Sequence, residues 1–240
     1  MQLGLISDVH GNQPALEAVL DDMPDVDRIY HCGDAVGYNP FPHRVLETLR
    51  AEGITSIQGN HDRKISTDID AMGTAADPET DDESGLRPGE LARLAGVWTH
   101  DRLDAEEMEY LAALPAELTV DGGNVKLVHG KPSDQDGRLY PEEYGPHLFD
   151  GESILVHGHT HVQHAERFDD RLLVNPGSVG QPRDGDRRAA YAVIDTEART
   201  ATLHRVPYPV EEVVDEIRRT SLPELLTLWL ENGEIVTEEA

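Results

Sequence analysis

The sequence predicts an α/β protein, and three observations lead to this class. Strand-like and helix-like hydrophobic patterns alternate over about the first 60 residues. Polar residues follow each of the strand-like segments in that region. Short apolar segments separated by turn residues then dominate the second half of the chain, before helical periodicity returns near its end.

The chain opens with a βαβαβ pattern. An apolar strand at Leu3–Ser7 precedes a helix at Gln13–Asp22, whose leucine and valine side chains share one face. The next three elements are expected at Arg28–His31 (strand), Pro42–Glu52 (helix) and Thr55–Gln58 (strand). In open α/β sheets ligands bind beyond the carboxyl ends of such strands, so the polar residues there are candidate functional residues.

The middle of the chain is expected to be helical after an acidic loop. Thr67–Glu83 has seven acidic residues and no basic ones, which is typical of a solvated loop. Helices are expected at Pro88–Asp101 and Asp104–Leu114, the second beginning with a capping box formed by Asp104 and Glu107.

The second half contains short strands and ends in helices. Strands are expected at Val125–Val128, Ser153–Val156, Leu172–Val174, Ala190–Ile194 and Thr200–Val206, and helices at Val210–Arg219 and Leu222–Glu231. We find no internal repeat and no linker. We therefore expect one domain over 1–240, with a helical insertion at about 65–115 and C-terminal helices at about 208–240.

The composition excludes several classes of protein. With 20 Lys and Arg against 47 Asp and Glu, the chain carries a formal charge of −27, which disfavours extended nucleic acid as a partner. Cys32 is the one cysteine, so no intrachain disulfide can form. No apolar run is long enough to cross a membrane, and the N-terminus lacks a basic region before its apolar residues, so a cytoplasmic location is expected. An acidic partner-binding protein and adaptation to concentrated salt both fit the charge, and we favour the second.

Five groups of potential metal ligands follow expected strands. They are Asp8-Val9-His10, Gly33-Asp34, Gly59-Asn60-His61-Asp62, His129-Gly130 and Gly158-His159-Thr160-His161. Residues two apart in an extended segment face the same side, so Asp8 and His10 can converge on one ion. Carboxylate, imidazole and amide groups without thiolates favour Mn, Fe, Zn, Co or Ni. The pattern therefore predicts a reactive metal site.

The ordered set resembles the calcineurin-like metallophosphoesterase superfamily, whose pattern is D-x-H, G-D, G-N-H-[DE], H and G-H-x-H. The segments His31–Pro42 and Asn175–Ser178 are similar to those of its small prokaryotic single-domain phosphodiesterases. The resemblance implies two metal ions. One is held by Asp8, His10, Asp34 and His161, and the other by Asp34, Asn60, His129 and His159.

The resemblance also implies a fold and an activity. The fold is a sandwich of two mixed β-sheets flanked by helices, with the insertion near the rim of the active site. The activity is hydrolysis of a small phosphodiester or phosphoric anhydride, a nucleotide being one candidate, by water that two metals activate, with Mn favoured. His61 then stays off the metals and protonates the leaving oxygen. A homo-oligomer is compatible with the sequence.

One departure concerns the choice of substrate. Serine/threonine protein phosphatases of the superfamily carry G-D-x-V-D-R-G, whereas Gly37 and Tyr38 stand here in place of the later Asp and Arg. This disfavours a protein phosphatase and leaves open what orients His61. A phosphomonoesterase and a catalytically silent metal-binding interaction protein remain alternatives.

Other polar residues are interpreted as structural. Seven histidines lie outside the motifs, and we expect at least five of them to be structural or solvated; they are His31, His43, His100, His147, His157, His164 and His204. Cys32 is expected to be a small buried residue. Arg183 could contact a substrate phosphate, but an ordinary loop arginine is the favoured interpretation.

Overall fold

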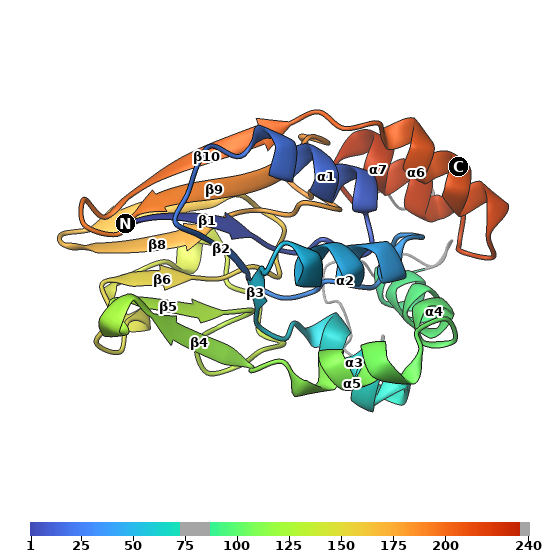
Figure 1. Cartoon of the computed structure of the whole chain (residues 1–240), viewed down its shortest axis with the longest axis horizontal. Coiled ribbons are helices and arrows are strands. Elements are labelled where there is room, and N and C mark those ends of the chain that lie inside the picture. The colour runs from blue at the N-terminus through green and yellow to red at the C-terminus, as the bar shows by residue number, and fades with distance from the viewer. Residues whose placement is uncertain (73–86, 236–240) are drawn as a thin grey trace.

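Two five-stranded β-sheets form the centre of the molecule (Figure 1). The computed structural model describes residues 1–72 and 87–235. The first sheet has the strand order β10-β9-β1-β2-β3, and the second has the order β4-β5-β6-β8-β7. Both sheets are mixed, as the sequence predicts.

The first sheet contains the βαβαβ unit. Its parallel strands are β1 (Gln2–Ile6), β2 (Arg28–His31) and β3 (Thr55–Ser56), connected by α1 (Gln13–Asp22) and α2 (Pro42–Ala51). On the other side of β1, β9 (Ala189–Asp195) and β10 (Thr200–Val206) add an antiparallel hairpin. The three parallel strands therefore end at the same edge of the sheet.

The second sheet has three parallel strands between two antiparallel edges. The parallel strands are β5 (Val125–Val128), β6 (Ile154–Val156) and β8 (Arg171–Asn175), and the edges are β4 (Glu117–Val120) and β7 (His164–Phe168). Short 3₁₀ turns occur at Asp121–Gly123, Pro141–Glu143 and Pro146–Leu148. The last two lie in the loop whose Tyr144, Leu148 and Phe149 cover the outer face of this sheet.

The side-chain alternation of β1 separates two cores. Leu3 and Leu5 pack between the sheets with Leu127 and Val156 of the second sheet. Ile6 points the other way, into a core shared with α1, α2, α6 (Val210–Arg219) and α7 (Leu225–Asn232). The period of two therefore places one face of β1 against a sheet and the other against helices.

A helical insertion connects β3 with β4. It contains α3 (Asn60–Thr67), a 3₁₀ turn at Ile69–Ala71, α4 (Pro88–His100) and α5 (Ala105–Ala113). Helix α3 packs against both α4 and α5. Figure 1 shows these helices at the end of the molecule away from the N-terminus. Within residues 1–72 and 87–235, no helix is both long and apolar enough to span a membrane.

The ends of most sequence-predicted helices and strands are confirmed to within three residues, but one helix and two strands were not predicted. Helix α3 and the edge strands β4 and β7 have no counterpart in the predictions. The loop expected at Thr67–Glu83 is wrong over 67–72, because this segment ends α3, forms the 3₁₀ turn and buries Met72 against Gly96. The rest of that loop lies outside the described residues.

Candidate metal centre

The loops at the carboxyl ends of the parallel strands of both sheets carry the candidate ligands. In the first sheet, Asp8 and His10 follow β1, Asp34 follows β2, and Asn60 begins α3 after β3. In the second sheet, His129 follows β5, while His159 and His161 follow β6. The two sheets thus contribute to one cluster, whose members are separated by up to about 150 residues in the chain.

The ligand atoms lie close enough to share ions. Asp8, His10 and His161 form one group with ligand atoms within 4.8 Å of one another, and Asp34, His129 and His159 form another. The Nε2 atoms of His10 and His161 are 3.0 Å apart, and Asp8 Oδ1 is 3.2 Å from His161 Nε2. Ligands about 2.1 Å from a shared ion would be separated by roughly 3.0–3.4 Å. These spacings therefore fit metal coordination.

Asp34 lies between the two groups. Its Oδ2 is 3.7 Å from His10 Nε2 and 3.3 Å from His129 Nε2. The amide oxygen of Asn60 is 3.0 Å from the same nitrogen of His129. A carboxylate in this position can coordinate an ion on each side. This is the bridging role that the resemblance implies for Asp34.

Backbone carbonyls fix the imidazole tautomers. Nδ1 of His129 donates to the carbonyl of Cys32 at 2.8 Å, and Nδ1 of His161 donates to that of Gln181 at 2.5 Å. Nδ1 of His10 is 3.3 Å from the carbonyl of Val36. A proton on Nδ1 leaves the Nε2 lone pair free for a metal, as at known metal sites.

The carboxylates are partly saturated by the protein and partly free. Asp8 Oδ2 accepts hydrogen bonds from Ser7 Oγ and from the backbone N–H of His159, whereas its buried Oδ1 has no hydrogen-bond donor, since it faces the lone pair of His161 Nε2. Leaving a buried carboxylate oxygen without a partner is costly. A cation beside Asp8 Oδ1 would satisfy it, so the residues present fit a metal.

The electrostatics of the cluster favour a bound cation. Burial raises the pKa of Asp8 and of Asp34, but nearby histidines outweigh burial and hold both below the ordinary range. Burial lowers the pKa of His129, but the charge of Asp34 overcomes this effect and raises it to about 10, so a metal ion at Nε2 of His129 would displace a proton. Both carboxylates are therefore anionic at neutral pH, and the cluster attracts positive charge.

The ligand loops have an unusual backbone. Five ligand residues have positive φ, namely Asp8 (54°), His10 (49°), Asp34 (60°), His159 (68°) and His161 (60°). Each costs on the order of 1 kcal/mol relative to an ordinary conformation. Hydrogen bonds between the loops hold these conformations, for example from Asp8 N to Gly33 O and from His10 N to Asp34 O, both 2.9 Å long.

Two motif glycines allow the loops to approach. A Cβ on Gly59 would lie 2.0 Å from Asp34 Oδ1, and one on Gly158 would lie 2.0 Å from Ser7 Oγ. The glycines in the motifs are therefore required by close packing around the carboxylates.

Residues 1–199 match the model of the calcineurin-like phosphoesterase superfamily domain. The chain belongs to this superfamily. It is 35% identical to a metallophosphoesterase from Sphaerobacter thermophilus, whose crystal structure aligns with a TM-score of 0.79 and covers 97% of this chain and 99% of that one. The superfamily depends on divalent metals, in agreement with the clustered histidines and aspartates.

The names of more distant relatives in the superfamily state different activities. Phosphodiesterase YfcE of Escherichia coli is 24% identical over 82% of this chain and 89% of its own length. Serine/threonine-protein phosphatase 2 of Escherichia coli is 23% identical over 75% of this chain and 88% of its own length. These names alone do not select one substrate class for this member.

His61 lies beside the ligands and is held by aromatic rings. Its ring centre is 4.8 Å from those of both His10 and Tyr38. Its Nδ1 is buried without a hydrogen-bond partner, and burial lowers its pKa to about 4. A third group of possible ligand atoms joins His61 with His10 and Asp34, so proximity alone does not separate it from the ligands.

Gly37 explains the absence of a carboxylate beside His61. A Cβ at this position would lie 2.8 Å from His61 Nδ1 and 2.9 Å from His10 Nδ1, and Gly37 has a φ of 141°. An aspartate therefore cannot replace Gly37 without displacing a histidine. The rings of Tyr38 and His10 pack against His61 where the protein-phosphatase motif has its later carboxylate.

Asp62, the last residue of the motif Gly59-Asn60-His61-Asp62, supports the structure of the site. The sequence alone predicts no role for it. Its carboxylate accepts backbone N–H groups from Asp34 (2.8 Å), Gly59 (2.9 Å) and Val36 (3.3 Å). Burial, followed by the charge of Asp34, raises its pKa to about 7. Asp62 therefore joins the Asp34 loop to the start of α3.

Several of the histidines outside the motifs make local structural contacts, whereas both ring nitrogens of buried His31 have no hydrogen-bond partner. For example, His43 pairs with Glu107, His100 Nδ1 donates to the carbonyl of Ile65, and His204 stacks on Tyr191. None of the seven belongs to a group of possible metal ligands among residues 1–72 and 87–235. Cys32 is buried, and burial raises the pKa of its thiol, as expected for an inert residue.

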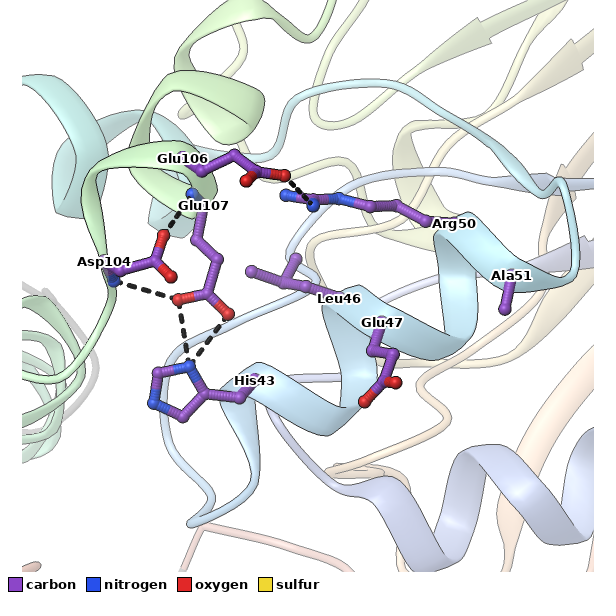
Figure 2. A pocket seen from close by; sticks show the side chains of 8 residues that line it. All are labelled: His43, Leu46, Glu47, Arg50, Ala51, Asp104, Glu106 and Glu107. Atoms are coloured by element: carbon purple, nitrogen blue, oxygen red, sulfur yellow. Dashed lines mark hydrogen bonds and ion pairs between the residues drawn. The ribbon is translucent and has the colours of Figure 1, made fainter.

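A separate pocket of about 490 Å³ lies between α2 and α5 (Figure 2). None of its lining residues belongs to the metal cluster. Figure 2 shows two pairs of polar side chains across it, with His43 hydrogen-bonded to Glu107 and Arg50 to Glu106, while Glu47 points away from them. The pocket is thus a paired polar contact between two helices and lacks the chemistry of the metal cluster.

Proposed function

We propose that this protein is a divalent-metal-dependent hydrolase of a small phosphodiester or phosphoric anhydride. The observation that carries the proposal is the convergence of seven potential ligands from both sheets, with His61 beside them. A site that only bound metal would not need a further imidazole next to the ligands.

The ligand assignment is the one that the resemblance implies, and the two groups of ligand atoms in the structure support it. Asp8, His10, Asp34 and His161 would hold one ion, and Asp34, Asn60, His129 and His159 the other, with Mn²⁺ favoured over Fe, Zn, Ni and Co. When bound, two such ions polarise phosphoryl oxygens and lower the pKa of a water molecule, which provides the nucleophile. The protein's own part is to fix the ligands through their carbonyl and carboxylate contacts.

His61 would protonate the departing oxygen. The rings of His10 and Tyr38 hold its imidazole at the edge of the ligand cluster. Burial disfavours its protonated form in the free protein, whereas the negative charge of a substrate phosphate favours that form. General-acid assistance of this kind contributes about 10²–10⁴ in rate.

The preference for a diester or an anhydride rests on Gly37 and Tyr38. The protein-phosphatase motif has an aspartate and an arginine at these positions, and the space beside His61 does not admit the aspartate. The formal charge of −27 opposes binding of extended nucleic acid, so a small phosphate compound is the proposed substrate.

Hydrolysis of an activated aryl phosphodiester against the matching monoester tests the proposal. The assay uses Mn²⁺ in molar KCl and compares wild type with Asp34→Asn, with metal content measured in parallel. We expect faster diester turnover by wild type, and loss of both metal and activity in Asp34→Asn. Faster monoester turnover would reject the diester preference, and metal-loaded protein inactive on both compounds would favour the interaction-protein alternative.

A further inference from the structure

The segment from Gln181 to Arg183 is attached to the ligand His161. The carbonyl of Gln181 accepts a hydrogen bond from His161 Nδ1 at 2.5 Å, and the backbone N–H of Arg183 donates to the carbonyl of His161 at 3.3 Å. Any side chain of this segment that turns inward therefore lies next to the metal cluster.

The Arg183 side chain turns toward Tyr38. Its guanidinium carbon is 5.5 Å from the centre of the Tyr38 ring, which itself lies 4.8 Å from the ring centre of His61. The guanidinium therefore packs on the ring that contacts His61, while its backbone is hydrogen-bonded to His161.

Arg183 also has unused hydrogen-bonding capacity. One Nη donates to the side-chain oxygen of Gln181 at 3.3 Å, while its Nε is buried without a partner. Nε2 of Gln181 is likewise buried without a partner. Among the described residues Arg183 forms no ion pair with a carboxylate, although acidic residues greatly outnumber basic ones in this chain.

An oxyanion would complete this arrangement. Buried N–H groups without acceptors are unfavourable, and a guanidinium binds phosphate oxygens through paired, charge-assisted hydrogen bonds. The carboxylates of Asp8 and Asp34 are directed toward the histidine ligands, and that of Asp184, next to Arg183 in the chain, pairs with Arg205. The missing acceptor is therefore one that enters the site with a ligand.

We propose that Arg183 binds a phosphoryl oxygen of the substrate, and that Gln181 donates a second hydrogen bond beside it. Tyr38 is then a positioning residue, because its ring packs both against the ring of His61 and against the guanidinium of Arg183. Tyr38 stands where the protein-phosphatase motif has an arginine, and Arg183 would supply a guanidinium from a loop 145 residues later. This inference rests on the proposed function.

Orthophosphate binding tests the inference without requiring turnover. Its dissociation constant is measured by calorimetry on Mn-loaded protein for wild type, Arg183→Met and Tyr38→Phe, with metal content determined for each. Arg188→Met is the matched control, because Arg188 lies in the same loop, is exposed and pairs only locally with Asp186. The same variants are assayed for kcat/KM on the diester.

We expect Arg183→Met to keep its metal and to weaken orthophosphate binding about 10- to 100-fold, the range for a lost charge-assisted hydrogen bond. Tyr38→Phe should weaken it about threefold, and Arg188→Met should match wild type. Wild-type affinity in Arg183→Met overturns the inference. So does loss of metal in both Arg183→Met and Arg183→Gln, because Arg183 would then support the ligands.

The two proposals can fail separately. Wild-type protein that binds orthophosphate but turns over neither ester contradicts the proposed activity, while the comparison of variants still decides the role of Arg183. Wild-type protein that binds metal but neither orthophosphate nor either ester contradicts both.

Discussion

Single side chains in the cluster are fixed by contacts that do not involve metal. The carbonyls of Cys32 and Gln181 hold the rings of His129 and His161, and three backbone N–H groups hold the carboxylate of Asp62. Such supporting contacts lower the conformational freedom that ligands lose on metal binding. At the residue scale, the site is therefore largely arranged by the protein itself.

His61 is expected to act on the reaction and not on metal retention. His61→Ala should keep the wild-type metal content and lose about 10²–10⁴ in kcat on the diester. Metal analysis of the purified variant and steady-state kinetics check this expectation. A variant that loses an ion would show that His61 is a ligand, as its group with His10 and Asp34 would allow.

Asp62 is expected to act through the position of Asp34. Asp62→Asn places an N–H donor where the protein offers only backbone N–H groups, so the Asp34 loop loses at least one hydrogen bond. We expect metal affinity to fall about 10- to 100-fold, measured by competition with a chelator. Equal affinity in the variant would contradict this role.

The fit of His61 against Gly37 can be tested with a second glycine as control. In Gly37→Ala the new Cβ would lie 2.8 Å from His61 Nδ1. Gly53 also has positive φ, but a Cβ added to it would have no atom within 4 Å. Gly37→Ala should therefore lose kcat at least tenfold, and Gly53→Ala should lose only about 1 kcal/mol of stability. Equal kcat in the two variants would mean that His61 tolerates displacement.

Helices were predictable where apolar residues recur at the helical period. Helices α1 and α6 have the predicted ends, and their buried residues follow that period. Strands β2, β5 and β10 also have the predicted ends. Strands β4 and β7 are edges without a fully buried residue, so their apolar signal is weak, although β4 alternates between exposed and half-buried residues.

Helix α3 and the Arg183 contact had no local signal of this kind. The sequence of α3, Asn60-His-Asp-Arg-Lys-Ile-Ser-Thr67, is mostly polar, and its start is fixed by Asp62 at the metal cluster. The candidate ligands could be predicted because they form an ordered set of motifs, each of which contains or adjoins a glycine. Arg183 and Tyr38 meet only through the fold, so an ordinary loop arginine was the reasonable expectation.

The capping box of α5 gives a prediction for a whole element. Asp104 and Glu107 satisfy each other's backbone N–H groups, and Glu107 also pairs with His43 of α2. Asp104→Ala should destabilise the protein by about 1 kcal/mol and leave kcat unchanged. Thermal unfolding and the diester assay check this, with Glu106→Gln as a control, since its pair with Arg50 involves an exposed carboxylate. Reduced kcat in Asp104→Ala would connect the α2–α5 pocket with catalysis.

The charge of the whole molecule predicts a dependence on salt. A formal charge of −27 repels itself, and screening shortens the range of that repulsion to about 3 Å at 1 M. The melting temperature of the metal-free protein, measured by calorimetry, should therefore be higher in 2 M KCl than in 0.1 M KCl. An equal rise in sucrose at matched water activity, or no rise, would contradict the electrostatic explanation.

The division of the ligands between the two sheets has a consequence for synthesis. A ribosome delivers Asp8, His10, Asp34 and Asn60 well before His129, His159 and His161, and β9 beside β1 comes later still. Nascent chains elongate at about 5–20 residues per second. For several seconds the emerging chain therefore exposes two carboxylates with His10 but without the three later imidazoles, and its metal centre can form only when the last third of the protein leaves the ribosome.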